Sequence, residues 1–240
     1  MDVGISLGWR CEAAQIALHN GIRSSRVDGY KTCPFDLMVS NYQGMMECIK
    51  DDFKYFCDPK YLELVRAPQV NCHLEDYQND DELWIYNTYY NFGFNHESPG
   101  HGNLYLDENW EFGINHFVEN NFERFIERYN KRIENFRNYL ATADKVNFII
   151  LRYNSIPSEL CTLLSEKYEN LNFEIHTYMG VSAWTLGITK GKDVKSAIEW
   201  EIENLVFMRF DKDEYSYEYD KYYNEPVDIS SADKRISFLN

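Results

Sequence analysis

A short, continuous apolar run in the second half of this chain constrains its fold more than any other feature. Residues 146–151 are apolar except for one asparagine, a pattern typical of a β-strand that is buried on both faces. Residues 119–140, which precede the run, repeat large apolar side chains at i, i+3, i+4 and i+7, and this spacing predicts a long amphipathic helix. Residues 157–168, which follow it, predict another helix, opened by a proline.

The alternation of strand and helix continues beyond this run. Residues 171–178 predict a strand and residues 193–207 a further helix. In the middle of the chain, residues 83–90 are rich in β-formers, and residues 103–106 and 110–117 predict the arms of a hairpin. The pattern predicts an α/β fold: a single layered domain whose sheet is partly parallel, made mixed by the hairpin, and flanked by helices.

The length of 240 residues is enough for one sizeable core. We therefore expect one α/β domain over residues 1–210. Residues 211–240 begin with an acidic stretch dense in tyrosine and predict a C-terminal hairpin or arm. Residues 57–81 are expected to be irregular.

The net charge of −15 disfavours a nucleic-acid partner, because a phosphate backbone would be repelled on average. Cationic residues cluster only at 23–31 and 128–137, and glutamates interrupt the second cluster as on a solvated helix face. No apolar run is long enough to cross a bilayer, so no membrane partner is expected. The six cysteines lack paired spacing and no secretory segment is seen, which predicts reduced thiols in the cytoplasm.

The residues best suited to catalysis or ligand binding lie near the start of the chain, in Ser6-Leu7-Gly8-Trp9-Arg10-Cys11. A predicted strand over residues 3–7 precedes this turn, and a predicted helix over residues 12–18 follows it. Cys11 would then lie at or beside a helix start, where unpaired N–H groups and the helix dipole favour a thiolate. Arg10 adds a positive charge beside it. Cys11 is therefore a candidate nucleophile.

A cysteine nucleophile needs a base, and His116 has the best context among the six histidines. It is expected to end a strand, on the same face as Phe112 and Ile114. The alternative is a histidine at the core edge that a backbone carbonyl satisfies. Asp36, stiffened by Pro34 and anchored by Phe35, is a candidate either to orient a histidine or to cap the next turn.

Two polar residues follow the buried strand at its carboxyl end, where ligands gather in layered α/β domains. These are Arg152 and Asn154, and the turn before Cys11 is expected at the same edge. Ser6, Gly8, Arg10 and Arg152 are accordingly our candidates for binding an anionic ligand. His96, His101 and the Cys72-His73 pair match no compact ligand motif, so we expect no metal and no cofactor.

Four motifs occur in a fixed order: Ser-Leu-Gly-x-x-Cys at 6–11, Pro-Phe-Asp at 34–36, a histidine before a long helix, and Arg-Tyr-Asn at 152–154. Together they resemble the DUF1796 family of papain-like cysteine peptidases of bacteria and large DNA viruses, over about residues 3–178. The resemblance implies Cys11 as nucleophile, His116 as base, and Asp36 or Asn154 as the third group. It also implies an α+β, papain-like fold as the alternative architecture.

The chain departs from the family pattern at three places. Trp9-Arg10 precedes the cysteine where the family has a small or amide residue, and Leu37 replaces a tryptophan. An acidic residue commonly follows the family's histidine, whereas Phe117 follows His116.

The leading hypothesis is a thiol hydrolase or acyl-transfer enzyme that acts on a protein or peptide. One alternative is a non-catalytic module that binds a phosphate, nucleotide or glycan. The other is an inactive enzyme scaffold that engages a host protein, which for a viral chain implies the host cytoplasm.

Overall fold

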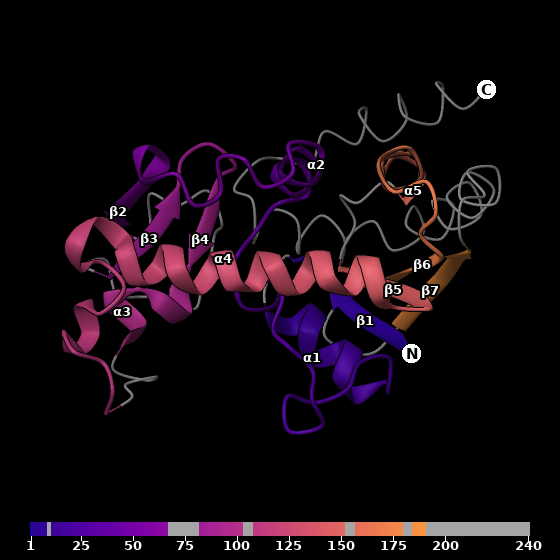
Figure 1. The fold of residues 1–240 in the computed structure, drawn as a ribbon, viewed down its shortest axis with the longest axis horizontal. Helices are drawn as coiled ribbons and strands as arrows, with labels where there is room; N and C mark the ends of the chain where they lie inside the picture. Colours follow the sequence, from indigo (N-terminus) through magenta and orange to yellow (C-terminus); the bar gives the residue numbers. More distant parts are fainter. Residues whose placement is uncertain (9–10, 67–81, 103–107, 152–156, 180–183, 191–240) are drawn as a thin grey trace, which may run out of the picture.

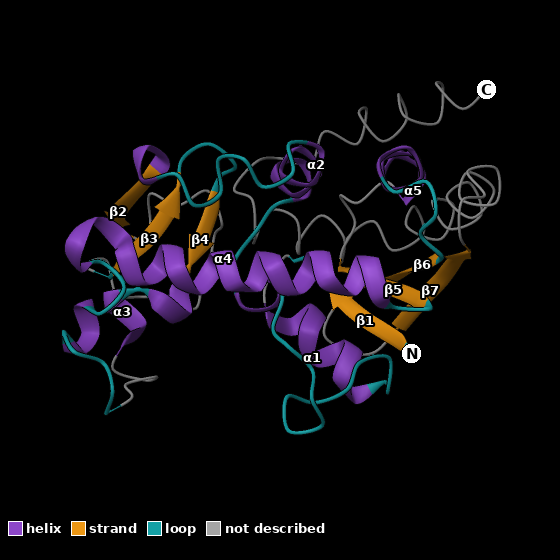
Figure 2. Ribbon diagram, viewed as in Figure 1, coloured by secondary structure: helices purple, strands orange, loops and turns teal. Residues whose placement is uncertain are grey.

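Two β-sheets and one long helix organise the part of the chain that the computed structural model describes, which is residues 1–8, 11–66, 82–102, 108–151, 157–179 and 184–190 (Figures 1 and 2). The first sheet has the strand order β1-β5-β6-β7 and the second β2-β3-β4. Their bounds are β1 Asp2–Ser6, β2 Leu62–Arg66, β3 Leu83–Asn87, β4 Phe92–Phe94, β5 Lys145–Leu151, β6 Phe173–Met179 and β7 Trp184–Lys190.

The first sheet confirms the predicted α/β class with a mixed, partly parallel sheet. Strand β5 pairs in parallel with both β1 and β6, whereas β6 and β7 are antiparallel. Side chains of β5 alternate between its two faces, as the apolar run predicts. Ile149 packs on α1 (Cys11–His19), while Val146, Phe148 and Ile150 belong to the main core.

The helices cover this sheet and connect it to the second one. Helix α4 (Glu119–Thr142) runs along both sheets in Figure 1, with α1 on one side of it and α2 (Tyr42–Lys50) and α5 (Pro157–Lys167) on the other. Asn41 caps α2, since its side-chain oxygen accepts a hydrogen bond from Gly44 N at 2.7 Å. Helices α4 and α5 confirm the helices that the sequence predicts at 119–140 and 157–168.

The middle of the chain differs from the prediction. Trp110–Phe117 is no hairpin arm: it contains a 3₁₀ turn, η5 (Gly113–Asn115), because Gly113 has a left-handed φ of 54° that breaks an extended strand. The other arm, 103–106, lies outside the described residues. The region 57–81 is not wholly irregular, because it holds β2. The first sheet is mixed because of β7, and β2–β4 form a sheet of their own.

One aromatic core joins the two sheets. Phe56 lies 5.3 Å from Tyr129 of α4 and 5.6 Å from Phe94 of β4, centroid to centroid, and the same cluster extends from Val3 to Ile175. The predicted boundary at residue 210, the helix at 193–207 and the arm at 211–240 lie outside the described residues. In the described part of the chain, no helix combines the length and apolarity that a membrane span needs.

Candidate active site

A tight turn links β1 to α1, as the sequence predicts. Gly8 has a φ of +99°, and its N–H donates a hydrogen bond to Ser6 Oγ at 3.1 Å. Leu7 N donates to Ile149 O at 2.8 Å, so the turn begins at the carboxyl edge of the parallel strands. Ser6 is fully buried. Two of the four predicted ligand-binding positions, Ser6 and Gly8, therefore serve to build the turn.

Cys11 is the first residue of α1 and its side chain is half-buried. The first N–H groups of a helix have no partner within that helix and carry the positive end of its dipole. Burial raises the pKa of Cys33 and Cys48 well above the usual value, and raises that of the half-buried Cys57 to about 12. Cys11 is thus both partly exposed and the first residue of a helix. Cys57 is also half-buried, so among the described cysteines it is the control for Cys11.

The Gly8 turn lies directly against the segment that follows the Pro-Phe-Asp motif. A side chain at Gly8 would overlap Ser40 Oγ. The residue before Ser40, Val39, forms two backbone hydrogen bonds of 2.8 Å with Gly93 of β4. The Cys11 turn is therefore connected, through Ser40 and Val39, to the end of β4.

A histidine follows β4 shortly after Gly93 along the chain. Strand β4 is followed at once by a 3₁₀ turn, η4 (Asn95–Glu97), in which His96 is half-buried. His96 lies only three residues beyond Gly93, the backbone partner of Val39. Turn η4 itself packs on α3 and β3, so Gly93 is the point at which this segment is joined to the Ser40 side of the Cys11 turn.

Glu97 anchors this turn on α4. Its side chain is fully buried, and Oε1 lies 3.0 Å from Arg132 Nη2 and 3.2 Å from Arg128 Nε. Tyr129 OH donates a hydrogen bond to Oε2 at 3.1 Å. Ser98 Oγ accepts a hydrogen bond from Ile85 N at 2.7 Å. The two residues that follow His96 are therefore fixed.

The local structure around His116 differs from the strand end that the sequence predicts. It follows η5 in a helical conformation and does not end a strand. Its ring stacks on Trp110 with centroids 5.6 Å apart. Turn η5 packs on α3 (Pro99–Gly102), whereas α1 packs on β1, β5 and η1 (Pro34–Leu37). In Figure 1, α3 lies near one end of α4 and α1 beneath its middle.

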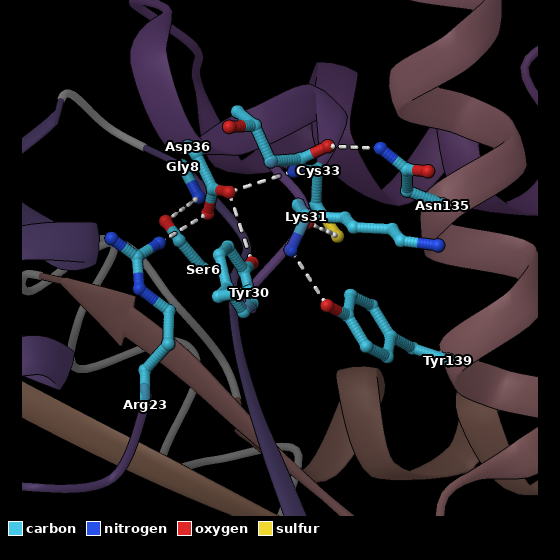
Figure 3. Close-up of polar contacts among 10 residues, drawn as sticks. Ser6, Gly8, Arg23, Tyr30, Lys31, Cys33, Asp36, Asn135 and Tyr139 are labelled. Atoms are coloured by element: carbon cyan, nitrogen blue, oxygen red, sulfur yellow. Dashed lines mark hydrogen bonds and ion pairs between the residues drawn. The ribbon is translucent and has the colours of Figure 1, made fainter. Parts of the chain in front are cut away.

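Asp36, the predicted orienting group, is occupied by other partners (Figure 3). Its carboxylate accepts hydrogen bonds from Cys33 N at 2.7 Å, from Tyr30 OH at 2.9 Å and from Arg23 Nη1 at 2.9 Å. Burial raises the pKa of Asp36, and the guanidinium of Arg23 acts in the opposite direction. These contacts fold the 30–36 loop and hold η1 against α1.

The remaining predicted site residues, Arg10, Arg152 and Asn154, lie outside the described residues. The parallel pairing of β1 and β5, with Ser6 opposite Ile149, places the carboxyl ends of both strands at one edge of the sheet. Within the described part of the chain, histidine, cysteine and acidic side chains form no group of three that could hold a metal ion.

The comparison with protein families agrees with this geometry. The family model described as "Putative papain-like cysteine peptidase (DUF1796)" matches residues 2–180. The chain belongs to the DUF1796 family. Neither the curated proteins nor the solved structures include a match. The DUF1796 match covers β1 to β6, α1 and α4, and leaves only β7 of the described strands outside it.

The DUF1796 pattern also draws attention to a second histidine. An acidic residue commonly follows the family's histidine, and in this chain His96 is the histidine that an acidic residue, Glu97, follows. The sequence suggests only metal ligation for His96. The connection of its segment to the Ser40 side of the Cys11 turn depends on the pairing of Val39 with Gly93, which no local pattern reveals.

Proposed function

We propose that this protein is a thiol hydrolase or acyl-transfer enzyme in which Cys11 is the nucleophile and His96 is its base. The connection from the Gly8 turn through Ser40 and Val39 to Gly93, three residues before His96, supports the proposal, and Glu97 fixes η4 on α4. His116, which the family resemblance first suggested, is the competing base.

The reaction follows from the position of Cys11 at the start of α1. The thiolate attacks a carbonyl carbon, and helix-start N–H groups stabilise the oxyanion that forms. The imidazolium of His96 gives its proton to the leaving amine as the C–N bond breaks, leaving an acyl-cysteine. Water, deprotonated by the neutral imidazole, then releases the acid and regenerates the thiol.

A third group would orient the imidazole. Both carboxylate oxygens of Asp36 already accept hydrogen bonds from other partners. Glu97 faces Arg128 and Arg132. Asn154, which follows β5, is therefore the group we propose for this role. A peptide or protein is the proposed substrate class, in keeping with the family description.

The first test is labelling with a peptide that carries an electrophilic vinyl sulfone, followed by mass spectrometry. The wild type should form one adduct at Cys11, and Cys57→Ser should label to the same extent. Cys11→Ala should fold, as judged by circular dichroism, and lose the label. Equal labelling of Cys11→Ala and the wild type would reject Cys11 as the nucleophile.

The second test asks for turnover. A mixed peptide library incubated with the wild type should yield new termini, or acyl transfer to an added amine, that are absent with Cys11→Ala. A protein that is labelled at Cys11 but gives no product from peptide, isopeptide or thioester substrates would contradict the enzymatic proposal. The inactive-scaffold hypothesis would then take its place.

A further inference from the structure

A strongly cationic pocket lies between the 26–32 loop and α4. It has a volume of about 800 Å³. Five cationic side chains line it, together with Val27, Tyr30, Thr32 and Asn135: Arg26, Lys31, Arg128, Lys131 and Arg132. The two cationic clusters of the sequence, which are a hundred residues apart, therefore meet at one place in a chain of net charge −15.

Hydrogen bonds between the loop and α4 hold this pocket open in a defined shape. Lys31 N donates to Tyr139 OH at 2.7 Å, and Asn135 Nδ2 donates to Thr32 O at 3.0 Å. Tyr30 stacks on Tyr139 with ring centroids 5.5 Å apart. Figure 3 shows the Lys31 side chain pointing toward α4. These contacts between the loop and α4 therefore bring the cationic side chains together.

The acidic partners of these cations do not balance them. Glu97 pairs with Arg128 and Arg132, and Glu134 pairs with Lys131 at 2.6 Å and also feels the charge of Lys31, which helps to lower the pKa of Glu134. The residues that line the pocket include no acidic side chain.

The two arginines differ: the pKa of Arg128 is lowered, whereas for Arg132 the effect of burial is outweighed by Tyr129, Glu97 and Asp36, which raise its pKa. Burial lowers the pKa of Arg128, and the positive charges of Arg132 and Arg26 lower it further, opposed by Glu97. Arg132 is 4% exposed, and its Nη1 is buried without a hydrogen-bond acceptor among the described residues. A buried guanidinium with an unmet donor is costly, and an oxyanion is the partner that matches it best.

We propose that this pocket binds a small molecule that carries two or more negative charges on phosphate or carboxylate groups. Guanidinium groups bind such oxyanions through paired hydrogen bonds, and lysines add point charges. The volume is that of a small-molecule site. The site is separate from the Gly8 turn, and it does not depend on Cys11 being a nucleophile.

Isothermal titration calorimetry of the full chain tests the proposal, with pyrophosphate and citrate as polyanions and acetate as a monoanion. Saturable binding is expected for a polyanion at low ionic strength, and not for acetate. Binding by pyrophosphate alone would assign phosphate chemistry, and binding by citrate alone would assign carboxylates. An absence of saturable binding for both polyanions overturns the proposal.

Arg26→Gln/Lys31→Gln is the variant of choice, because both side chains are exposed and should be removable without loss of the fold. It should weaken polyanion binding about tenfold. Lys54→Gln/Lys60→Gln removes the same charge outside the pocket and should bind as the wild type does. Equal weakening in the two variants would mean that only the overall charge matters, and would also overturn the proposal.

Discussion

Glu97 and Arg132 form a buried ion pair in which Oε1 and Nη2 lie 3.0 Å apart, with side chains 0% and 5% exposed. The pair joins η4, which holds His96, to the middle of α4. It also supplies one wall of the cationic pocket through Arg132. This contact therefore connects the proposed catalytic base with the proposed anion site.

Removing the charge of Glu97 should destabilise the fold strongly. Glu97→Gln leaves Arg132 buried without its counter-charge, and we expect the free energy of unfolding to fall by about 3 kcal/mol. Glu134→Gln breaks an exposed pair with Lys131 and should cost far less than Glu97→Gln. Urea unfolding of both variants measures the difference, and equal losses would contradict the anchoring role of Glu97.

Gly8 should not tolerate a side chain. Gly8→Ala combines a left-handed φ with a clash against Ser40 Oγ. Gly29→Ala is the matched control, because its φ of +96° is nearly the same and nothing lies within 4 Å of the added carbon. We expect thermal or urea unfolding to show a loss of about 1 kcal/mol for Gly29→Ala and about 2 kcal/mol more for Gly8→Ala. Similar losses would show that Ser40 does not press on the turn.

Asp36 should prove to be structural. Asp36→Asn removes the charge that Arg23 faces at 2.9 Å in a buried site, and should lower the free energy of unfolding by about 2–3 kcal/mol. The alkylation rate of Cys11 in the folded fraction should not change. A slower rate, at equal folded fraction, would return Asp36 to the role of orienting group.

His176 should make the stability depend on pH. Burial lowers its pKa below the usual value of about 6.5, Glu174 opposes this, and Lys145 adds to it. The unfolded chain therefore takes up the proton more readily than the folded chain. The stability that the neutral imidazole contributes is present above pH 6.5 and is lost as the pH falls below it.

Urea unfolding at several pH values between about 5 and 7 measures this effect. Over that range the wild type should lose about 1 kcal/mol more than His176→Gln. The exposed His19 is the control, so His19→Gln should follow the wild type. A wild-type profile as flat as that of His176→Gln would contradict the effect of burial.

Elements with strong local patterns were predictable from the sequence. The apolar run of β5 and the 3.6-residue periodicity of α4 identify both elements, and the Gly8 turn identifies the start of α1. These segments carry their own signal, because burial on one or two faces dictates their composition.

Elements that depend on distant partners were not predictable in this way. Strand β4 has only three residues, and its pairing with Val39 joins segments more than fifty residues apart. Only Leu62 of β2 is buried, so the burial pattern of β2 resembles that of a loop. The sequence predicts His116 at the end of a strand, and the left-handed Gly113 removes that strand.

The pKa of the Cys11 thiol tests the central claim most directly. It can be measured from the pH dependence of alkylation by iodoacetamide, with mass spectrometry reading Cys11 separately from Cys57. We predict a pKa clearly below the usual value of about 8.5, which rises in His96→Gln and stays unchanged in His116→Gln. An ordinary pKa that neither substitution moves would contradict the account, and a rise confined to His116→Gln would return the role of base to His116.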